Sequence, residues 1–294
     1  MKQQFQELYY KHYKKLFLIP LLIVILALSV LVWNYSTTGD IMAKDVSLKG
    51  GTTATIYSDI AFENLEGILE ERFGEDFTVR ELKEFGSDKY IGTVVEVSNI
   101  NGDDLKVALE EIIGLTLNEE NFSVEFVGGS LGESFYKQMA IALVLAYIFM
   151  AIVVFIAFRI PVPSFIVIFA AFGDMLCTLA VMDLFGMKLS TAGIAAILLL
   201  IGYSVDTDIL LTTKLLRRGE GTLFTRLIES MKTGLTMTAT SFVALGIGYL
   251  LANSLVLKQM FLIIMIGLVF DVIMTYGMNA GMLIWYLKRR KVEE

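Results

Sequence analysis

The sequence predicts a polytopic α-helical membrane protein, with six transmembrane helices and a βαββαβ ferredoxin-like external domain between helices one and two. Three observations favour this fold class. Hydrophobic residues make up 55% of the 294 residues, several segments reach the roughly 20 apolar residues that cross a bilayer, and a long polar insertion separates the first two of them. The predicted transmembrane helices are residues 16–33, 139–158, 164–184, 189–211, 236–252 and 260–287.

The first helix is predicted to stay in the protein as a membrane span. It lacks the small-residue cleavage site of a signal peptide, and Trp33 and Tyr35 suit the aromatic belt of a membrane interface. The chain then divides into an N-terminal part (1–33), an insertion (34–137), the remaining five helices (138–287) and a C-terminal tail (288–294).

Basic residues predict the orientation, because cytoplasmic loops carry an excess of lysine and arginine. Those on one side of the predicted membrane are Lys11, Lys14, Lys15, Arg159, Lys214, Arg217, Arg218, Arg226, Lys232, Lys288, Arg289, Arg290 and Lys291. The short loops on the other side contain only Lys188 and Lys258. We therefore expect a multi-pass protein of the cell membrane, with both termini in the cytoplasm and residues 34–137 outside.

The insertion holds most of the acidic residues of a chain whose net charge is −7, which argues against nucleic acid as a partner. Its pattern predicts strands at 52–58, 77–85, 89–99 and 121–129, and amphipathic helices at 61–74 and 101–114. Residues 86–88 read as a hairpin turn, Asn101 or Asp103 as the N-cap of the second helix, and Gly114 as its end. This order is the ferredoxin-like unit, which many unrelated functions share.

The loop between helices four and five, residues 214–234, is predicted to be amphipathic and cytoplasmic. Apolar residues at helical spacing lie beside basic ones; they are Leu223, Phe224, Leu227, Ile228 and Met231. The segment is either an interfacial helix that transmits motion or an ordinary surface linker helix.

Acidic residues inside apolar segments are the main candidates for function. Four such acids lie in the predicted helices: Asp174, Asp206, Asp208 and Asp271. No lysine or arginine accompanies them in these apolar stretches. A charge at the centre of a membrane costs about 2.5–3.5 kcal/mol even on insertion scales. These four residues are therefore predicted to relay protons or ions, to meet a cation from another chain, or, as neutral acids, to hold helices together.

Helical phase separates two of these acids. Asp206 shares a face with Gly202, whereas Asp208 lies on the other side of the same helix and nearer its cytoplasmic end. We expect Asp206 to face the interior and Asp208 to reach Lys214 or water. Thr178 and Thr275 each follow a buried acid by four residues, so we expect their hydroxyl groups to bond the carboxyl groups of Asp174 and Asp271.

Five glycines lie where the insertion joins the predicted membrane helices: Gly50, Gly51, Gly128, Gly129 and Gly132. They are either hinges that let the insertion swing or turn residues that supply positive φ angles.

Three motifs lie at the predicted membrane boundaries: VSLKGGT after the first helix, VGGSLGES before the second and IAAILLLIGYSVDTDILL at the fourth. In this order they resemble the SecF family, whose six-span members work with SecD beside the protein-export channel. Six spans with one large domain after the first also resemble half of an RND-superfamily protein. Where bacterial members of the family have Asn-Asp-Thr, this sequence has Asp206-Thr207-Asp208. Thr236 stands in the place of a bacterial arginine, and Asp271 stands in the place of a small or hydroxyl residue. These differences resemble the archaeal type.

The resemblance implies an accessory subunit of the Sec translocase that couples proton or ion movement to motion of the external domain. It implies a SecD-like six-span protein, the Sec translocon channel, a translocating polypeptide and the lipid bilayer as partners. Half of an RND-type lipid or small-molecule transporter and a structural translocon scaffold are the alternatives. The sequence contains no nucleophile–base arrangement, phosphate loop or metal cluster, so we expect neither an enzyme, a cofactor nor a metal. Asn34 and Asn121 match the glycosylation sequon.

Overall fold

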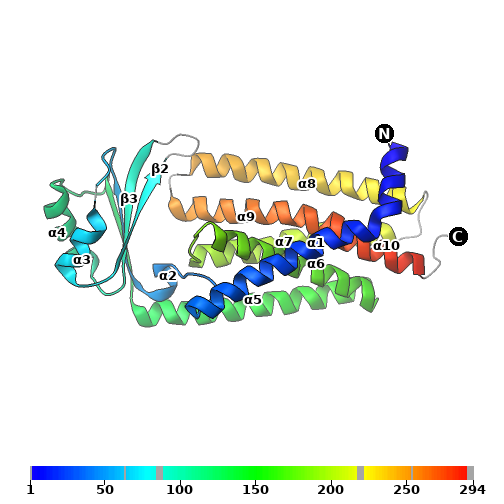
Figure 1. The fold of residues 1–294 in the computed structure, drawn as a ribbon, viewed down its shortest axis with the longest axis horizontal. Coiled ribbons are helices and arrows are strands. Elements are labelled where there is room, and N and C mark those ends of the chain that lie inside the picture. Colours follow the sequence, from blue (N-terminus) through cyan, green and yellow to red (C-terminus); the bar gives the residue numbers. More distant parts are fainter. Residues whose placement is uncertain (1, 63, 84–88, 217–221, 253, 290–294) are drawn as a thin grey trace. The chain divides into compact units, whose positions relative to one another are not determined.

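The structure is a computed structural model that describes residues 2–62, 64–83, 89–216, 222–252 and 254–289. The chain forms two compact units (Figure 1). The second unit consists of Lys44–Ala140 with Leu189–Thr191, and the rest of the chain forms the first.

An antiparallel sheet is the centre of the second unit. Its described strands are β1 (Gly51–Tyr57), β2 (Phe77–Lys83), β3 (Tyr90–Val97) and β4 (Phe122–Val127), in the order β2-β3-β1-β4. Helix α3 (Leu65–Phe73) follows β1, and α4 (Gly102–Ile113) follows β3, while the short α2 (Val46–Lys49) precedes the sheet. The predicted βαββαβ domain is confirmed, although the predicted turn at 86–88 lies outside the described residues.

Two helices cover one face of this sheet (Figure 1). Each helix carries two leucines four residues apart, which therefore point to the same side of that helix. They are Leu65 and Leu69 on α3, and Leu105 and Leu109 on α4. All four are buried and pack with Ile56 and its apolar neighbours on the sheet. Both helices end at a glycine in the left-handed conformation, Gly74 with φ 68° and the predicted Gly114 with φ 71°.

Helix α3 begins later than the sequence predicts. Asn64, immediately before it, has φ 55° and ψ 25°, which is the left-handed conformation. The chain therefore turns at Asn64, and residue 61 lies outside the helix.

Six described helices of the chain are long and apolar enough to cross a membrane, as predicted. The first five are α1 (Lys2–Thr38), α5 (Gly129–Phe158), α6 (Pro161–Leu184), α7 (Thr191–Leu216) and α8 (Leu223–Leu251). The last span is α9 (Leu255–Ile273), which continues through a π-helix, η1 (Met274–Asn279), into α10 (Ala280–Arg289).

The amphipathic segment and the fifth span form one continuous helix, α8, rather than two elements. Glu229, Lys232 and Thr233 lower the hydropathy of the segment, but no proline interrupts it, so the helix continues. Thr222 caps its start by accepting a hydrogen bond from the backbone N–H of Thr225 at 3.3 Å. The apolar face of the segment is buried against α10 and the end of α7.

Close packing of α1, α6 and η1 forms the core that surrounds the candidate site. Val24 of α1, Cys177 of α6 and Met278 of η1 are buried in one cluster. A Cβ at Gly173 of α6 would lie 3.2 Å from Val24 Cγ2, so a glycine lets α1 approach this closely. The acidic residues of α6 and α9 lie beside this core.

Candidate functional site

Three of the four predicted relay residues are buried together in the first unit. Asp174 on α6 and Asp271 on α9 are each 1% exposed, and Asp208 on α7 is 0% exposed. Their described hydrogen-bond partners are hydroxyl and amide groups rather than lysine or arginine. We call these three acids and the polar side chains that bond them the buried acidic cluster.

Asp174 joins α6 to α7. Ser204 of α7 donates a hydrogen bond from its hydroxyl group to Asp174 Oδ2. The hydroxyl group of Thr178 donates instead to the backbone carbonyl of Asp174, at 2.7 Å. The expectation that Thr178 bonds the Asp174 carboxyl is therefore wrong, because a threonine inside a helix readily bonds the carbonyl one turn earlier.

Asp271 joins the last span to α7. The hydroxyl oxygen of Thr207 lies 2.9 Å from Asp271 Oδ1 and 3.0 Å from Oδ2. Thr275, one turn further along the chain, has its hydroxyl oxygen 3.3 Å from Asp271 Oδ1, which is the contact expected from the sequence.

Asp208 receives two hydrogen bonds from the π-helix. Asn279 donates from its side-chain amide to Asp208 Oδ1 at 2.6 Å, and Thr275 donates from its hydroxyl group to the same oxygen at 2.9 Å. Both partners are 0% exposed. The backbone N–H of Ala280 bonds the carbonyl of Thr275, five residues earlier, and such π-turns occur often at functional sites.

Asp206 and Asp208 face opposite to the sequence-based expectation. Asp206 is exposed on the surface of this chain, whereas Asp208 is buried, so the expectation of a buried Asp206 and an interfacial Asp208 is wrong. Gly202 and Tyr203, one turn before Asp206, are exposed as well. The phase argument separated the two acids correctly, but Gly202 and Asp206 lie on an exposed part of α7.

Three members of the buried acidic cluster were not singled out from the sequence: Ser204, Thr207 and Asn279. One signal for Asn279 was available, because Asp271, Thr275 and Asn279 follow one another at intervals of four residues in an apolar span. The bonds to α7 join residues 30 to 71 positions apart, so local sequence could not reveal them.

One further acid has a different environment. Asp183, near the end of α6, is half-buried and accepts a hydrogen bond from the side-chain amide of Asn34 at 2.5 Å. In the part of the chain that the structure describes, no group of three or more His, Cys, Asp or Glu side chains is arranged to hold a metal ion.

The five glycines predicted as hinges are not equivalent. Gly50 and Gly51 have φ angles of 84° and 132°, a conformation that favours glycine. A Cβ at Gly132 would lie 2.5 Å from the backbone nitrogen of Gly50, whereas Gly128 has nothing within 4 Å of that position. Gly50 also leaves no room for a Cβ, because the backbone of Gly129 occupies that place.

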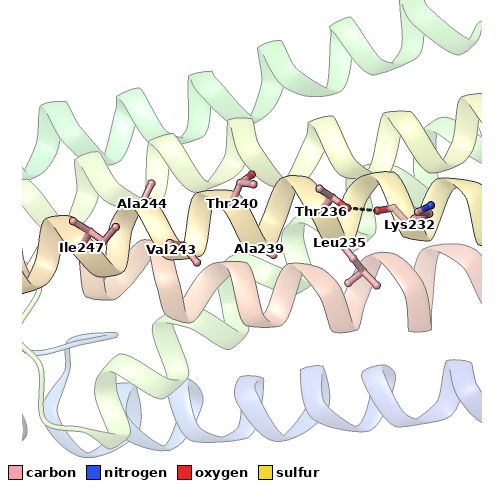
Figure 2. A pocket seen from close by; sticks show the side chains of 8 residues that line it. All are labelled: Lys232, Leu235, Thr236, Ala239, Thr240, Val243, Ala244 and Ile247. Carbon is pink, nitrogen blue, oxygen red and sulfur yellow. Dashed lines mark hydrogen bonds between the residues drawn. The ribbon is translucent and has the colours of Figure 1, made fainter.

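An open apolar groove runs along α8 (Figure 2). It is lined by Lys232, Leu235, Thr236, Ala239, Thr240, Val243, Ala244 and Ile247. The hydroxyl groups of Thr236 and Thr240 donate to backbone carbonyls of the same helix, at 2.7 and 2.8 Å. The groove therefore offers mainly methyl groups to whatever lies against it.

Comparisons with known proteins agree with one another. The family model described as "Protein export membrane protein SecD/SecF, C-terminal" matches residues 108–289. The chain is 37% identical over 282 residues to the protein-export membrane protein SecF of Pyrococcus furiosus, which covers 96% of this chain and 93% of that protein. It is 34% identical over 291 residues to SecF of Methanocaldococcus jannaschii, covering 97% and 99%.

The crystal structure of SecDF, a translocon-associated membrane protein from Thermus thermophilus, has a similar fold. It matches with a TM-score of 0.72 at 20% identity, covering 94% of this chain. This chain spans only 38% of the length of that SecDF chain.

Proposed function

The chain belongs to the SecD/SecF family of protein-export membrane proteins, and we propose that its buried acidic cluster couples proton movement to protein export. It is an accessory subunit of protein export in the cell membrane. The coupling would convert movement of protons through the first unit into motion of the second unit, which would draw an exported polypeptide outward.

The observation that carries this proposal is the burial of Asp174, Asp208 and Asp271 among hydroxyl and amide groups. Removal of a carboxyl group from water disfavours its charged form. No cation is described beside these acids, so three negative charges at this place would repel one another and be costly. The cluster is therefore suited to take up and release protons. An ionisable residue inside a membrane span is by default a hypothesis for a functional site.

We also propose the orientation given by the basic residues. Both termini would lie in the cytoplasm, and the domain that contains β1–β4 would lie outside. The groove of α8 would then begin near the cytoplasm at Lys232 and extend outward to Ile247.

A second six-span protein of the SecD type is the proposed partner. Asp206 is exposed inside an apolar span, where a lipid-facing charge would be costly. Contact with another protein removes this cost if that protein supplies a cation or hydrogen-bond donors. The apolar groove of α8 offers a second surface against which a helix of the partner would pack. The Sec translocon channel and the exported polypeptide are the other proposed partners.

The substitution Asp208→Asn tests the coupling. Asparagine has nearly the same shape as the neutral acid but cannot release a proton. We expect normal assembly with the partner and a strong loss of export in membrane vesicles that carry a proton gradient. Asp183→Asn is the matched control, because Asp183 bonds Asn34 outside the buried acidic cluster.

Full export by the Asp208→Asn variant would contradict the coupling role. Loss of assembly in the same variant would identify the chain as a structural scaffold of the translocon. Asp206→Asn completes the series, and we expect its main effect on assembly with the partner.

A further inference from the structure

The last strand of the sheet, β4, forms one of its edges. The order β2-β3-β1-β4 places β1 on one side of β4 and no described strand on the other. Four successive residues, 123–126, are exposed. Two of them are apolar, since Val124 is 41% and Phe126 is 59% exposed. An edge of this kind is a template on which another chain can pair.

The pairing of β4 with β1 determines which of its backbone groups point outward. Tyr57 donates its backbone N–H to the carbonyl of Asn121 at 2.8 Å, so these residues form a hydrogen-bonded pair. Such pairs alternate along antiparallel strands, and the register therefore directs the backbone groups of Glu125 toward β1. The N–H and C=O groups of Val124 and Phe126 consequently point away from the sheet.

The chain itself occupies only the beginning of this outer side. By the same alternation the N–H of Phe122 points outward, and it bonds the carbonyl of Asn118 in the preceding turn at 2.8 Å. Within the described part of the chain, the outward groups of Val124 and Phe126 have no such partner. Because backbone groups need a hydrogen-bond partner, they are left to water or to a further strand.

The opposite edge of the sheet is protected against pairing. Strand β2 carries Arg80, Glu81 and Lys83, and its register with β3 shifts between Leu82 and Lys83. Charged side chains and irregular pairing are the means by which proteins keep edge strands from binding other chains. Strand β4 has one charged residue, Glu125, and a continuous register with β1. The sheet is therefore blocked at one edge and open at the other.

Side chains of β4 alternate between the two faces of the sheet. Val124 lies on the face that α4 covers, because a Cβ at Gly102 of α4 would lie 2.8 Å from Val124 Cγ2. Phe126 shares this face, and Glu125 lies on the other. In an added antiparallel strand, the residue directly opposite Val124 has its side chain on the same face. The edge therefore favours a segment whose apolar residues occupy every second position.

Charges around β4 favour basic residues at the positions between. Glu125 is exposed, and so are Glu119 and Glu120 in the turn before the strand. Lys106 of α4 has its ammonium group 5.9 Å from the ring centroid of Phe122, so this cation already has a contact. A second copy of the chain that paired through its own β4 would place like charges together, which disfavours self-association.

The size of the open edge favours an unfolded chain over a folded domain as its partner. Stable interfaces between folded proteins bury about 1,200–2,000 Å² and use roughly 20–30 residues on each side. Strand β4 has six residues, of which Val124 and Phe126 are the exposed apolar ones. Main-chain hydrogen bonds give affinity for an extended segment of almost any sequence, while side chains add a preference.

We propose that β4 binds an extended polypeptide segment as an added antiparallel strand. Apolar side chains of the segment lie beside Val124 and Phe126, and its basic side chains lie beside Glu125. The outward backbone groups of β4 form the main-chain hydrogen bonds. That the segment belongs to a polypeptide in export rests on the proposed function, whereas the strand addition itself does not.

Peptide binding to the purified full-length chain in detergent tests the inference. The probe is a fluorescent peptide of four Val-Lys repeats, and fluorescence anisotropy measures its dissociation constant. In the proposed strand the valines lie opposite Val124 and Phe126 and direct their N–H groups toward β4. N-methylation of the valines should weaken binding at least about tenfold, because several backbone hydrogen bonds are lost. N-methylation of the lysines should leave binding unchanged, since their N–H groups point away from β4.

Variants of the chain test the side chains of the edge. Phe126→Ser should weaken binding, whereas Val107→Ser is the matched control, because Val107 is 53% exposed on α4. Glu125→Lys should weaken binding of the Val-Lys peptide by about threefold to tenfold, since an attractive charge pair becomes a repulsive one. The same variant should bind a peptide of four Val-Glu repeats more tightly than the unaltered chain does. Circular dichroism identifies any variant that fails to fold, and the N-methylated peptides test the unaltered chain in that case.

Three results would overturn the proposal. The first is equal binding of the two N-methylated peptides, or a loss that follows only from methylation of the lysines. The second is unchanged binding by folded Phe126→Ser and Glu125→Lys variants, which would place the peptide elsewhere. The third is a stable dimer of the chain, or a complex with a folded partner, that excludes the peptide and is disrupted by Phe126→Ser.

Export assays separate this inference from the proposed function. Peptide binding needs no proton gradient, so Asp208→Asn should bind the Val-Lys peptide normally even where its export is lost. If Phe126→Ser binds the peptide weakly and exports normally, the added strand stands and its role in export fails.

Discussion

Gly234 of α8 lies directly against the phenolic hydroxyl group of Tyr276 in the π-helix, with no room for a Cβ atom between them. Tyr276 is 7% exposed and belongs to the cluster in which α7, α8 and α10 pack. The contact joins the N-terminal half of α8 to the π-helix that carries the hydrogen-bond donors of Asp208.

Gly234→Ala is expected to lower the free energy of unfolding, because an added methyl group that displaces a packed ring costs about 1–3 kcal/mol. The higher helix propensity of alanine offsets about 1 kcal/mol of this cost, so the net loss is up to about 2 kcal/mol. Thermal unfolding of the purified chain in detergent measures the change. Gly202→Ala is the control, since nothing lies within 4 Å of its Cβ position. Equal melting temperatures for the two variants would show that the Tyr276 contact is not tight.

Ser204→Ala is expected to destabilise the chain by about 1 kcal/mol, the usual scale for a hydrogen bond between helices in a membrane. The substitution leaves Asp174 without the donor that joins α6 to α7. Thr178→Ala should cost less, because that hydroxyl group bonds only a backbone carbonyl of its own helix. A larger loss for Thr178→Ala, measured by the same unfolding experiment, would reverse the assigned roles.

Residues 45–133 are expected to fold as a soluble fragment, because their apolar cluster is formed within the second unit. Circular dichroism should show mixed helix and strand content and one cooperative melting transition. Leu109→Ala should lower the free energy of unfolding by about 2–5 kcal/mol, since Leu109 is 0% exposed. Val107→Ala on the same helix should change it little, as Val107 is 53% exposed. A fragment without a cooperative transition would contradict the prediction.

Gly132→Ala is expected to destabilise the second unit, because a methyl group there meets the backbone of Gly50. Gly128→Ala meets no atom within 4 Å and should leave stability unchanged. The pair also tests the hinge prediction by comparing export with melting temperature. Reduced export by a stable Gly128→Ala variant supports a hinge there, and normal export argues that Gly128 only connects β4 to α5.

Local patterns predicted most of the fold. Alternating residues gave β1 to β4, and helical spacing gave α3 and α4, because both depend on neighbours within a few positions. The end of α4 at Gly114 followed from the same local chemistry. The boundary between the loop and α8 was missed, since a polar stretch lowers hydropathy without ending a helix.

The candidate site was predicted only in part. Three of the acids could be found because a carboxyl group in an apolar span is conspicuous. The inward face of α7 could not be predicted, because both faces of this helix are largely apolar. Only the positions of α6 and η1 in the folded chain decide which acid is buried. Asn279 was missed for a related reason, since its partner Asp208 is 71 positions away.

The π-helix also sets the rotation of α10 about its own axis. One extra residue in a helical turn rotates everything after it by about 100° around the axis. With this rotation in place, Leu283 and Leu287 of α10 lie in one buried cluster with Leu211 and Leu223. Any rearrangement that returned η1 to α-helical geometry would turn α10 out of that cluster while it withdrew Asn279 from Asp208. The same short segment therefore determines both which side of α10 meets its cluster and where the amide group of Asn279 meets Asp208.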